Sequence, residues 1–142
     1  MPVICVTESK YISLIVTNKS HMIWYMPAVL LTVGIAIISL WEAPQLPPPV
    51  MSLGDKVLHG LMYTVLAVAW MIPVSQRWPK RWTQYVYVCL AVTAYGALME
   101  MLQRYCTLTR SGEMADVYAD FIGALIGVGI IGLWRILFTT SR

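Results

Sequence analysis

Charged side chains are scarce in this chain. Only 12% of its 142 residues are Asp, Glu, Lys or Arg, whereas soluble domains carry about 25%. Hydrophobic residues make up 58%, and the mean hydropathy is +0.67. So few charges cannot cover the water-facing surface of a small soluble domain, and so many apolar residues exclude a disordered chain. The composition therefore predicts an integral membrane protein, and the length suits one domain.

Cysteine and histidine are also few, which argues against several kinds of site. The three cysteines form no CxxC pair and have no histidine at ligand spacing, so a zinc site is not expected. With a net charge of +3 and no Lys/Arg cluster on a helix face, the chain is not expected to bind nucleic acid. The opening residues also lack the pattern of a cleavable signal peptide.

Long apolar runs are what the sequence has instead. A membrane-spanning helix needs about 20 predominantly apolar residues. Four runs qualify and predict an all-α integral membrane protein with four transmembrane helices, at about 22–41, 57–73, 83–102 and 117–138. We expect residues 1–20 to be a short cytoplasmic lead and residues 21–142 to form one four-helix membrane domain.

The connections between these runs predict how the helices are oriented. Prolines at positions 44, 47, 48 and 49 predict an extended segment that excludes helix. Seven of the ten Lys and Arg residues lie towards the two termini and in the loop at 75–82, and three lie on the other side. Because basic segments favour the cytoplasm, we expect both termini to be cytoplasmic. The proline-rich connection and the loop after the third run would then face outward.

Polar side chains gather at the predicted outward ends of three helices. Residues three or four apart share a helix face, and each of these helices carries such a pair. The pairs are Asp55 with His59, Glu100 with Gln103, and Asp116 with Asp120, while Arg110 lies in the loop before the last pair. Acidic residues within a membrane span usually face the bundle interior or a wet cavity. We therefore expect a polar pocket that opens outward.

The last helix also carries a ridge of small residues. Positions 115, 119, 123 and 127 are Ala, Ala, Gly and Gly, and small residues four apart let helix backbones approach closely. Gly123 and Gly127 fall on the same helix face as Asp116 and Asp120. The pattern predicts that the packing face and the acidic face both point into the bundle.

Together these motifs resemble those of the VanZ-like family. That family usually has D-K-x-x-H before one span, E-x-x-Q closing the next, and an R…D…N…G…G element opening the last. The chain has G-D-K-V-L-H-G at 54–60, E-M-L-Q at 100–103, R-S at 110–111, aspartates at 116 and 120, and G-x-x-x-G at 123–127. Several ordered motifs at matching spacing make the resemblance specific.

The resemblance implies an environment and a set of residues, but no substrate. It implies a bacterial plasma (inner) membrane protein with an envelope-related role, because the family is named for a protein linked to teicoplanin resistance. The positions that match the family's motifs are Asp55, Lys56, His59, Glu100, Gln103, Arg110, Asp116, Gly123 and Gly127.

One position departs from the family pattern. Asp120 stands where the family more often has Asn. A protonated aspartic acid has the shape of asparagine and donates a hydrogen bond as the amide does. We therefore expect Asp120 to be neutral at least part of the time, and Asp120→Asn to be nearly silent.

Two interpretations of the polar set remain open. In the first, His59 and Glu100 act as acid–base groups, Arg110 holds an anion, and Asp55, Lys56, Gln103, Asp116 and Asp120 contribute to ligand binding. In the second, the same side chains cap helix ends and pair with one another, and they only lock the helices together. A Mg²⁺ or Mn²⁺ site is chemically possible, but phosphoryl-transfer enzymes usually have denser acidic motifs, so no cofactor is expected.

The sequence thus favours an envelope protein whose outward pocket binds an anionic lipid or a cell-wall-derived head group. One alternative is a membrane enzyme, a transferase or hydrolase acting on lipid or cell-wall intermediates with Glu100 and His59 as acid–base groups. A second alternative is a purely structural helix bundle. A proton-coupled transporter fits less well, because no acidic residue is expected near the middle of the membrane. The sequence does not fix the oligomeric state.

Overall fold

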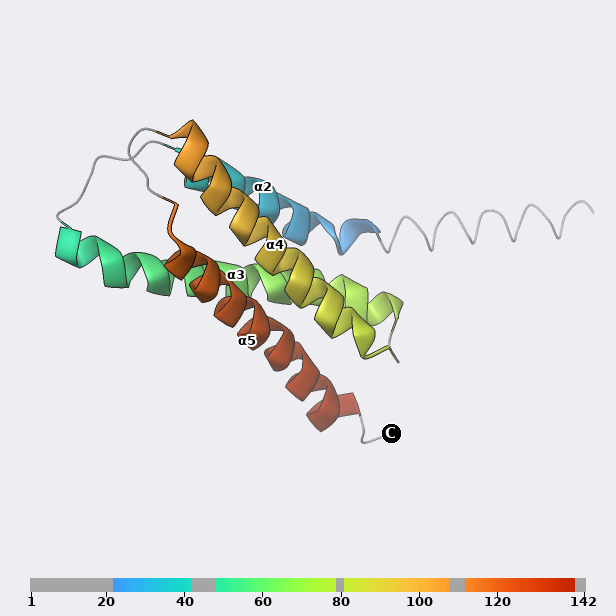
Figure 1. The fold of residues 1–142 in the computed structure, drawn as a ribbon. Coiled ribbons are helices and arrows are strands. Elements are labelled where there is room, and N and C mark those ends of the chain that lie inside the picture. The colour runs from blue at the N-terminus through green and yellow to red at the C-terminus, as the bar shows by residue number, and fades with distance from the viewer. Residues whose placement is uncertain (1–21, 42–47, 79–80, 108–111, 140–142) are drawn as a thin grey trace, which may run out of the picture.

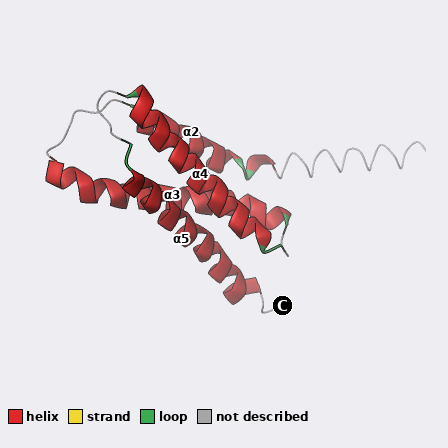
Figure 2. Ribbon diagram, viewed as in Figure 1, coloured by secondary structure: helices red, strands yellow, loops and turns green. Residues whose placement is uncertain are grey.

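The predicted all-helical fold is confirmed. The computed structural model describes residues 22–41, 48–78, 81–107 and 112–139, and within them the regular structure is entirely helical (Figures 1 and 2). The helices are α2 (Met26–Leu40), α3 (Pro48–Arg77), α4 (Thr83–Cys106) and α5 (Met114–Thr139). The expected lead at 1–20 lies outside the described residues.

Three of the four helices match the predicted membrane spans. Gly54–Arg77, Thr83–Cys106 and Met114–Phe138 are each long and apolar enough to cross a membrane. Helix α2 is apolar but has only 15 residues, so at 1.5 Å per residue it is about 22 Å long, shorter than a hydrocarbon core of about 30 Å. The predicted first span at 22–41 is therefore present as a shorter apolar helix, which ends where Trp41 turns to extended backbone.

The prediction that the prolines exclude helix is wrong at two positions. Helix α3 begins at Pro48 and includes Pro49. Proline is tolerated in the first turn of a helix, because the N–H that it lacks would have no partner there. Helix α3 also continues through Pro73 to Arg77, one turn beyond the predicted end of the span. The other two prolines of the segment lie outside the described residues.

Helices that follow one another in the chain run in opposite directions. Helices α2 and α4 end where α3 and α5 begin, so four helix termini share one end of the bundle (Figure 1). The most extensive contact is between α3 and α5. It is made possible by glycine, because a Cβ at Gly123 would collide with the carbonyl of Gly60, and one at Gly127 with the backbone of Thr64. Thr64 Oγ1 also donates a hydrogen bond of 3.0 Å to the Gly123 carbonyl.

Helix α2 is tied to the bundle by polar contacts from α3 and α4. Trp70 Nε1 donates to Thr32 Oγ1 over 3.1 Å, and the Tyr95 hydroxyl donates to the Thr32 carbonyl over 2.6 Å. Near the C-terminal end of α2, Gln103 Nε2 donates to the Ser39 carbonyl over 2.9 Å. These bonds fix a short helix that buries few of its own side chains.

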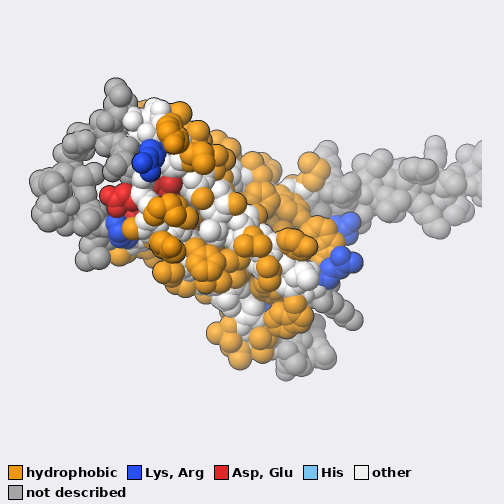
Figure 3. Space-filling view, viewed as in Figure 1, with side chains coloured by type: hydrophobic (Ala, Val, Ile, Leu, Met, Phe, Trp, Pro, Cys, Tyr) orange, Lys and Arg blue, Asp and Glu red, His pale blue; other side chains and the backbone are white. Residues whose placement is uncertain are grey.

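The outer surface has the pattern of a protein surrounded by lipid. Large apolar side chains are exposed along α2, α4 and α5, including Val33, Leu90, Ile126 and Leu133. In the space-filling view, hydrophobic side chains cover the middle of the molecule and charged side chains lie at its two ends (Figure 3). Such a broad exposed apolar surface would be unfavourable in water, and it agrees with the three helices of membrane-spanning length.

Candidate functional site

The candidate site is centred on a buried pair formed by His59 of α3 and Asp120 of α5. His59 Nδ1 and Asp120 Oδ1 are hydrogen-bonded at 3.1 Å, and Asp120 is 0% exposed. The pair lies at the end of the bundle where α3 and α5 begin. The close approach of these two helices at Gly60 and Gly123 keeps the two side chains within hydrogen-bonding reach.

Helix α4 adds Glu100 to this pair. Glu100 Oε1 lies 3.6 Å from His59 Nδ1, just beyond hydrogen-bond length, while Glu100 Oε2 accepts a hydrogen bond of 3.0 Å from the backbone N–H of Glu113. One side chain from each of three helices thus meets at a single point. We call His59, Glu100 and Asp120 the central triad.

A glycine on α4, Gly96, leaves room for the triad because it has no side chain. A Cβ at Gly96 would collide with the carboxyl group of Asp120. Gly96 lies one turn before Glu100 on the same face of α4. The glycine therefore lets α4 and α5 approach while a buried carboxyl group sits between them.

An ion-paired layer lies outside the central triad. Lys56 Nζ is 3.3 Å from Glu113 Oε2 and 3.6 Å from Asp116 Oδ1. The Asp116 side chain is buried, whereas that of Lys56 is 32% exposed. Lys56 therefore places a positive charge at the rim of the cluster.

Asp55 also lies at this rim, on the other side of the His59 ring. His59 Nε2 is 4.0 Å from Asp55 Oδ1, and the Asp55 side chain is partly exposed. The imidazole thus has its Nδ1 against the buried carboxyl groups and its Nε2 towards the rim. This orientation suits a group that exchanges a proton with something at the rim.

The remaining predicted site residues are placed differently. Gln103 is buried, but its amide binds the α2 backbone at Ser39 rather than the triad. Gly123 and Gly127 face α3, while Ala115 at the start of the predicted small-residue ridge is exposed. Arg110 lies outside the described residues.

The described part of the cluster is acidic. It contains five carboxyl groups, on Asp55, Glu100, Glu113, Asp116 and Asp120, beside the side chains of Lys56 and His59. One buried oxygen on each of Glu100, Asp116 and Asp120 has no hydrogen-bond partner within the described ranges. Buried polar atoms without partners cost free energy, so these three oxygens mark where protons or a ligand would be stabilising.

The central triad also has the spacing of metal ligands. Its members each offer one ligand atom, and these atoms all lie within 4.8 Å of one another. Two carboxylates and an imidazole form a donor set that divalent cations accept. The expectation that the protein binds no metal remains a prediction, and the metal content of the purified protein would test it.

A comparison with protein-family models identifies the relatives of this chain. The model described as VanZ/LLP1 matches residues 5–135. The chain belongs to this family. The resemblance inferred from the motifs is thereby confirmed. No curated protein and no solved structure shows significant similarity to the chain.

In this VanZ/LLP1 protein, two residues of the site were missed by the motif pattern. Glu113 binds Lys56 through its carboxylate and Glu100 through its backbone N–H. Its position at the start of the last helix, three residues before Asp116, was the available signal. The available signal for Gly96 was that it is a lone glycine, one turn before Glu100, in a helix otherwise built of larger residues.

Proposed function

We propose that this VanZ/LLP1 protein acts in the cell envelope by binding a head group at the cluster around the central triad. The ligand is an anionic lipid or a cell-wall-derived intermediate, and what the two have in common is a phosphate next to hydroxyl groups. The proposal includes a bacterial plasma-membrane location, with both termini cytoplasmic and the cluster facing outward. The role is of the kind seen in glycopeptide resistance, in which a bound head group is kept from antibiotics such as teicoplanin.

The observation that carries the proposal is the set of buried carboxyl oxygens without partners. Glu100 and Asp116 come from different helices, and each has one buried oxygen with no hydrogen-bond partner among the described residues. The Asp116 oxygen has only the ion pair with Lys56 at 3.6 Å. A purely structural polar lock would be expected to satisfy its own members, because an unsatisfied buried group costs about 1–3 kcal/mol. Oxygens that stay free are better explained by a ligand that donates hydrogen bonds to them.

The charges around the cluster suggest how a head group would be held. Lys56 at the rim would pair with the phosphate, as a lysine ammonium does in many phosphate sites. Hydroxyl groups next to the phosphate would donate to Glu100 Oε1 and to Asp116 Oδ1, which gives up its ion pair when Lys56 turns to the phosphate. Arg110, which lies outside the described residues, remains a predicted second ligand for the anion.

Protection against teicoplanin tests this proposal. The chain would be expressed in a teicoplanin-sensitive bacterium, and the minimal inhibitory concentration would be compared for the wild type, Lys56→Ala and Arg104→Ala. Arg104 is the matched control, because it is an exposed basic residue at the same end of the bundle. We expect protection by the wild type and the control, and loss of protection in Lys56→Ala at equal abundance in the membrane. Equal protection by all three would refute a role for the rim lysine.

A second candidate function is favoured by the orientation of His59. An imidazole held at Nδ1 by a buried carboxyl group, with Nε2 towards the rim, is the arrangement of a general base. A transferase or hydrolase acting on lipid or cell-wall intermediates would use it, with Glu100 as the second acid–base group. Lipid analysis of membranes with and without the protein distinguishes an enzyme from a head-group-binding protein. An enzyme changes the abundance of a lipid species in a way that depends on His59, and a binder leaves the composition unchanged.

A further inference from the structure

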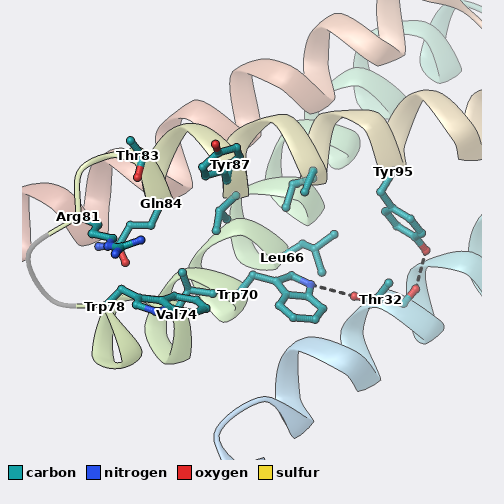
Figure 4. A pocket seen from close by; sticks show the side chains of 13 residues that line it. Thr32, Leu66, Trp70, Val74, Trp78, Arg81, Thr83, Gln84, Tyr87 and Tyr95 are labelled. Atoms are coloured by element: carbon teal, nitrogen blue, oxygen red, sulfur yellow. Dashed lines mark hydrogen bonds between the residues drawn. The ribbon is translucent and has the colours of Figure 1, made fainter.

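A pocket lies towards the opposite end of the bundle from the central triad. It has a volume of about 530 Å³, within the range of about 300–1,000 Å³ that is typical of small-molecule sites. Helices α2, α3 and α4 contribute its lining (Figure 4). None of its lining residues belongs to the cluster described above. We call it the aromatic groove.

The aromatic groove changes in character along its length. Towards one end, Leu66 and Trp70 provide an apolar lining, and at the other end lie the side chains of Arg81 and Gln84 (Figure 4). A long apolar stretch closed by a cation and an amide suits an amphipathic ligand whose charged part lies at one end.

Gln84 is the strongest sign that something occupies the groove. The residue is only 5% exposed, and neither its amide nitrogen nor its amide oxygen has a hydrogen-bond partner within the described ranges. Buried amides are nearly always hydrogen-bonded, so a side chain left free on both atoms calls for an external partner. Because Gln84 lines the groove, that partner would lie in it.

Arg81 indicates the charge of the partner. It is exposed at the mouth of the groove, and it forms no ion pair with any carboxylate in the part of the chain that the structure describes. Arg81 lies one turn before Gln84, whose backbone N–H donates to the Arg81 carbonyl over 3.4 Å, and both residues line the same end of the groove (Figure 4). A guanidinium and an unpartnered amide donor at one end of a groove are suited to the oxygens of a phosphate.

The occupant must also reach the groove through the side of the bundle. Tyr87 lines the groove and is exposed on the outer surface of α4, in a helix of membrane-spanning length. In a membrane that surface is covered by lipid acyl chains, and the polar end of the groove lies where α4 begins, near the level of the head groups. Trp78 at the same end is typical of the membrane–water interface.

We infer that the aromatic groove binds one phospholipid of the surrounding bilayer. An acyl chain lies along the apolar part, and the anionic phosphate binds Arg81 while the Gln84 amide donates to a phosphate or ester oxygen. This site is separate from the head-group cluster and does not depend on the function proposed for it. It requires an acyl chain and an anionic phosphate, but no head-group hydroxyls.

Native mass spectrometry of the full chain tests the inference. The protein would be released from bilayers containing equal amounts of phosphatidylcholine and phosphatidylmethanol with identical acyl chains. Phosphatidylmethanol is anionic but has no head-group hydroxyls, so it is a poor mimic for the cluster. We expect one retained phospholipid and a preference for phosphatidylmethanol. Loss of one charge-assisted hydrogen bond in Arg81→Ala should lower the preference about tenfold.

Matched variants separate the groove from the general surface. Arg77→Ala removes another exposed basic residue at the same end, so it should not change the preference. Ala91→Trp should fill the groove and abolish retention, whereas Leu90→Trp on the neighbouring exposed position should not. The inference is overturned if Arg81→Ala and Arg77→Ala have equal effects, or if Ala91→Trp retains lipid as the wild type does. It is also overturned if the groove is covered by a second copy of the chain, seen as a lipid-free dimer.

Discussion

Gly96 and Asp120 contact each other across the interface between α4 and α5, and the carboxyl group of Asp120 occupies the space that a side chain at Gly96 would fill. The same carboxyl group is hydrogen-bonded to His59 on α3. The position of one glycine therefore controls the geometry of a polar cluster built from three helices.

Replacing that glycine should disturb both packing and the cluster. We expect Gly96→Ala to lower the free energy of unfolding by about 1–3 kcal/mol, because the new methyl group must displace a buried carboxyl group. Thermal unfolding of the purified protein in detergent would measure the change. Gly129→Ala is the control, since a Cβ there meets nothing within 4 Å and alanine favours helix. Equal destabilisation by the two substitutions would contradict the conclusion that Gly96 makes room for the Asp120 carboxyl group.

The crossing of α3 and α5 gives a second prediction about packing. A Cβ at Gly123 would meet the backbone of Gly60, which cannot move as a side chain can. Gly123→Ala should therefore destabilise the protein more than Gly132→Ala, where the new methyl group only reaches the Tyr85 ring at 3.4 Å. The two unfolding midpoints, compared in one detergent, measure this difference, and the reverse order would refute close packing at Gly123.

Substitutions at Asp120 test the protonation expected there. Asp120→Asn keeps the shape and the ability to hydrogen-bond to His59, so stability and teicoplanin protection should stay close to those of the wild type. Asp120→Leu has a similar size but leaves His59 without this partner, and it should cost about 1–3 kcal/mol. A large loss of protection in Asp120→Asn would show that the carboxylate itself is required.

The predicted orientation can be tested with fusions. A reporter that works only in the cytoplasm should be active when it is fused after Arg142, and a reporter that works only in the periplasm should be inactive there. The reason is that most basic residues lie towards the predicted cytoplasmic side of the membrane. A periplasmic signal from this fusion would reverse the topology and place the cluster on the cytoplasmic side.

Much of this architecture was predictable from hydropathy and helical spacing. The apolar runs predict the helices, and the pairs at i,i+4 predict that His59 and Asp120 lie on inward faces. The contact partners were not predictable, because they depend on which helices pack together. Gln103 illustrates this, since a three-residue offset turns it about 60° away from Glu100 around the helix, enough to face α2 instead of the triad.

The predicted boundaries of α3 were wrong because of local features of the chain. The proline rule assumes a helix interior, but Pro48 and Pro49 lie in the first turn, where a missing N–H costs nothing. Pro73 does lie inside α3, and the helix continues past it for one further turn. Neither the composition nor the hydropathy carries this information.

The central claim is that the free carboxyl oxygens serve a ligand rather than the fold. Glu100→Gln tests it, because glutamine keeps the shape of the side chain and still accepts the hydrogen bond from the Glu113 N–H. The most direct measurement is calorimetric binding of glycerophosphoglycerol, a soluble phosphate flanked by hydroxyl groups, to the chain in phosphatidylcholine nanodiscs. Thermal unfolding would be measured on the same samples. We predict that Glu100→Gln weakens binding about tenfold while the unfolding midpoint is unchanged. Unchanged binding, or a collapse of stability with no separate loss of binding, would contradict the account.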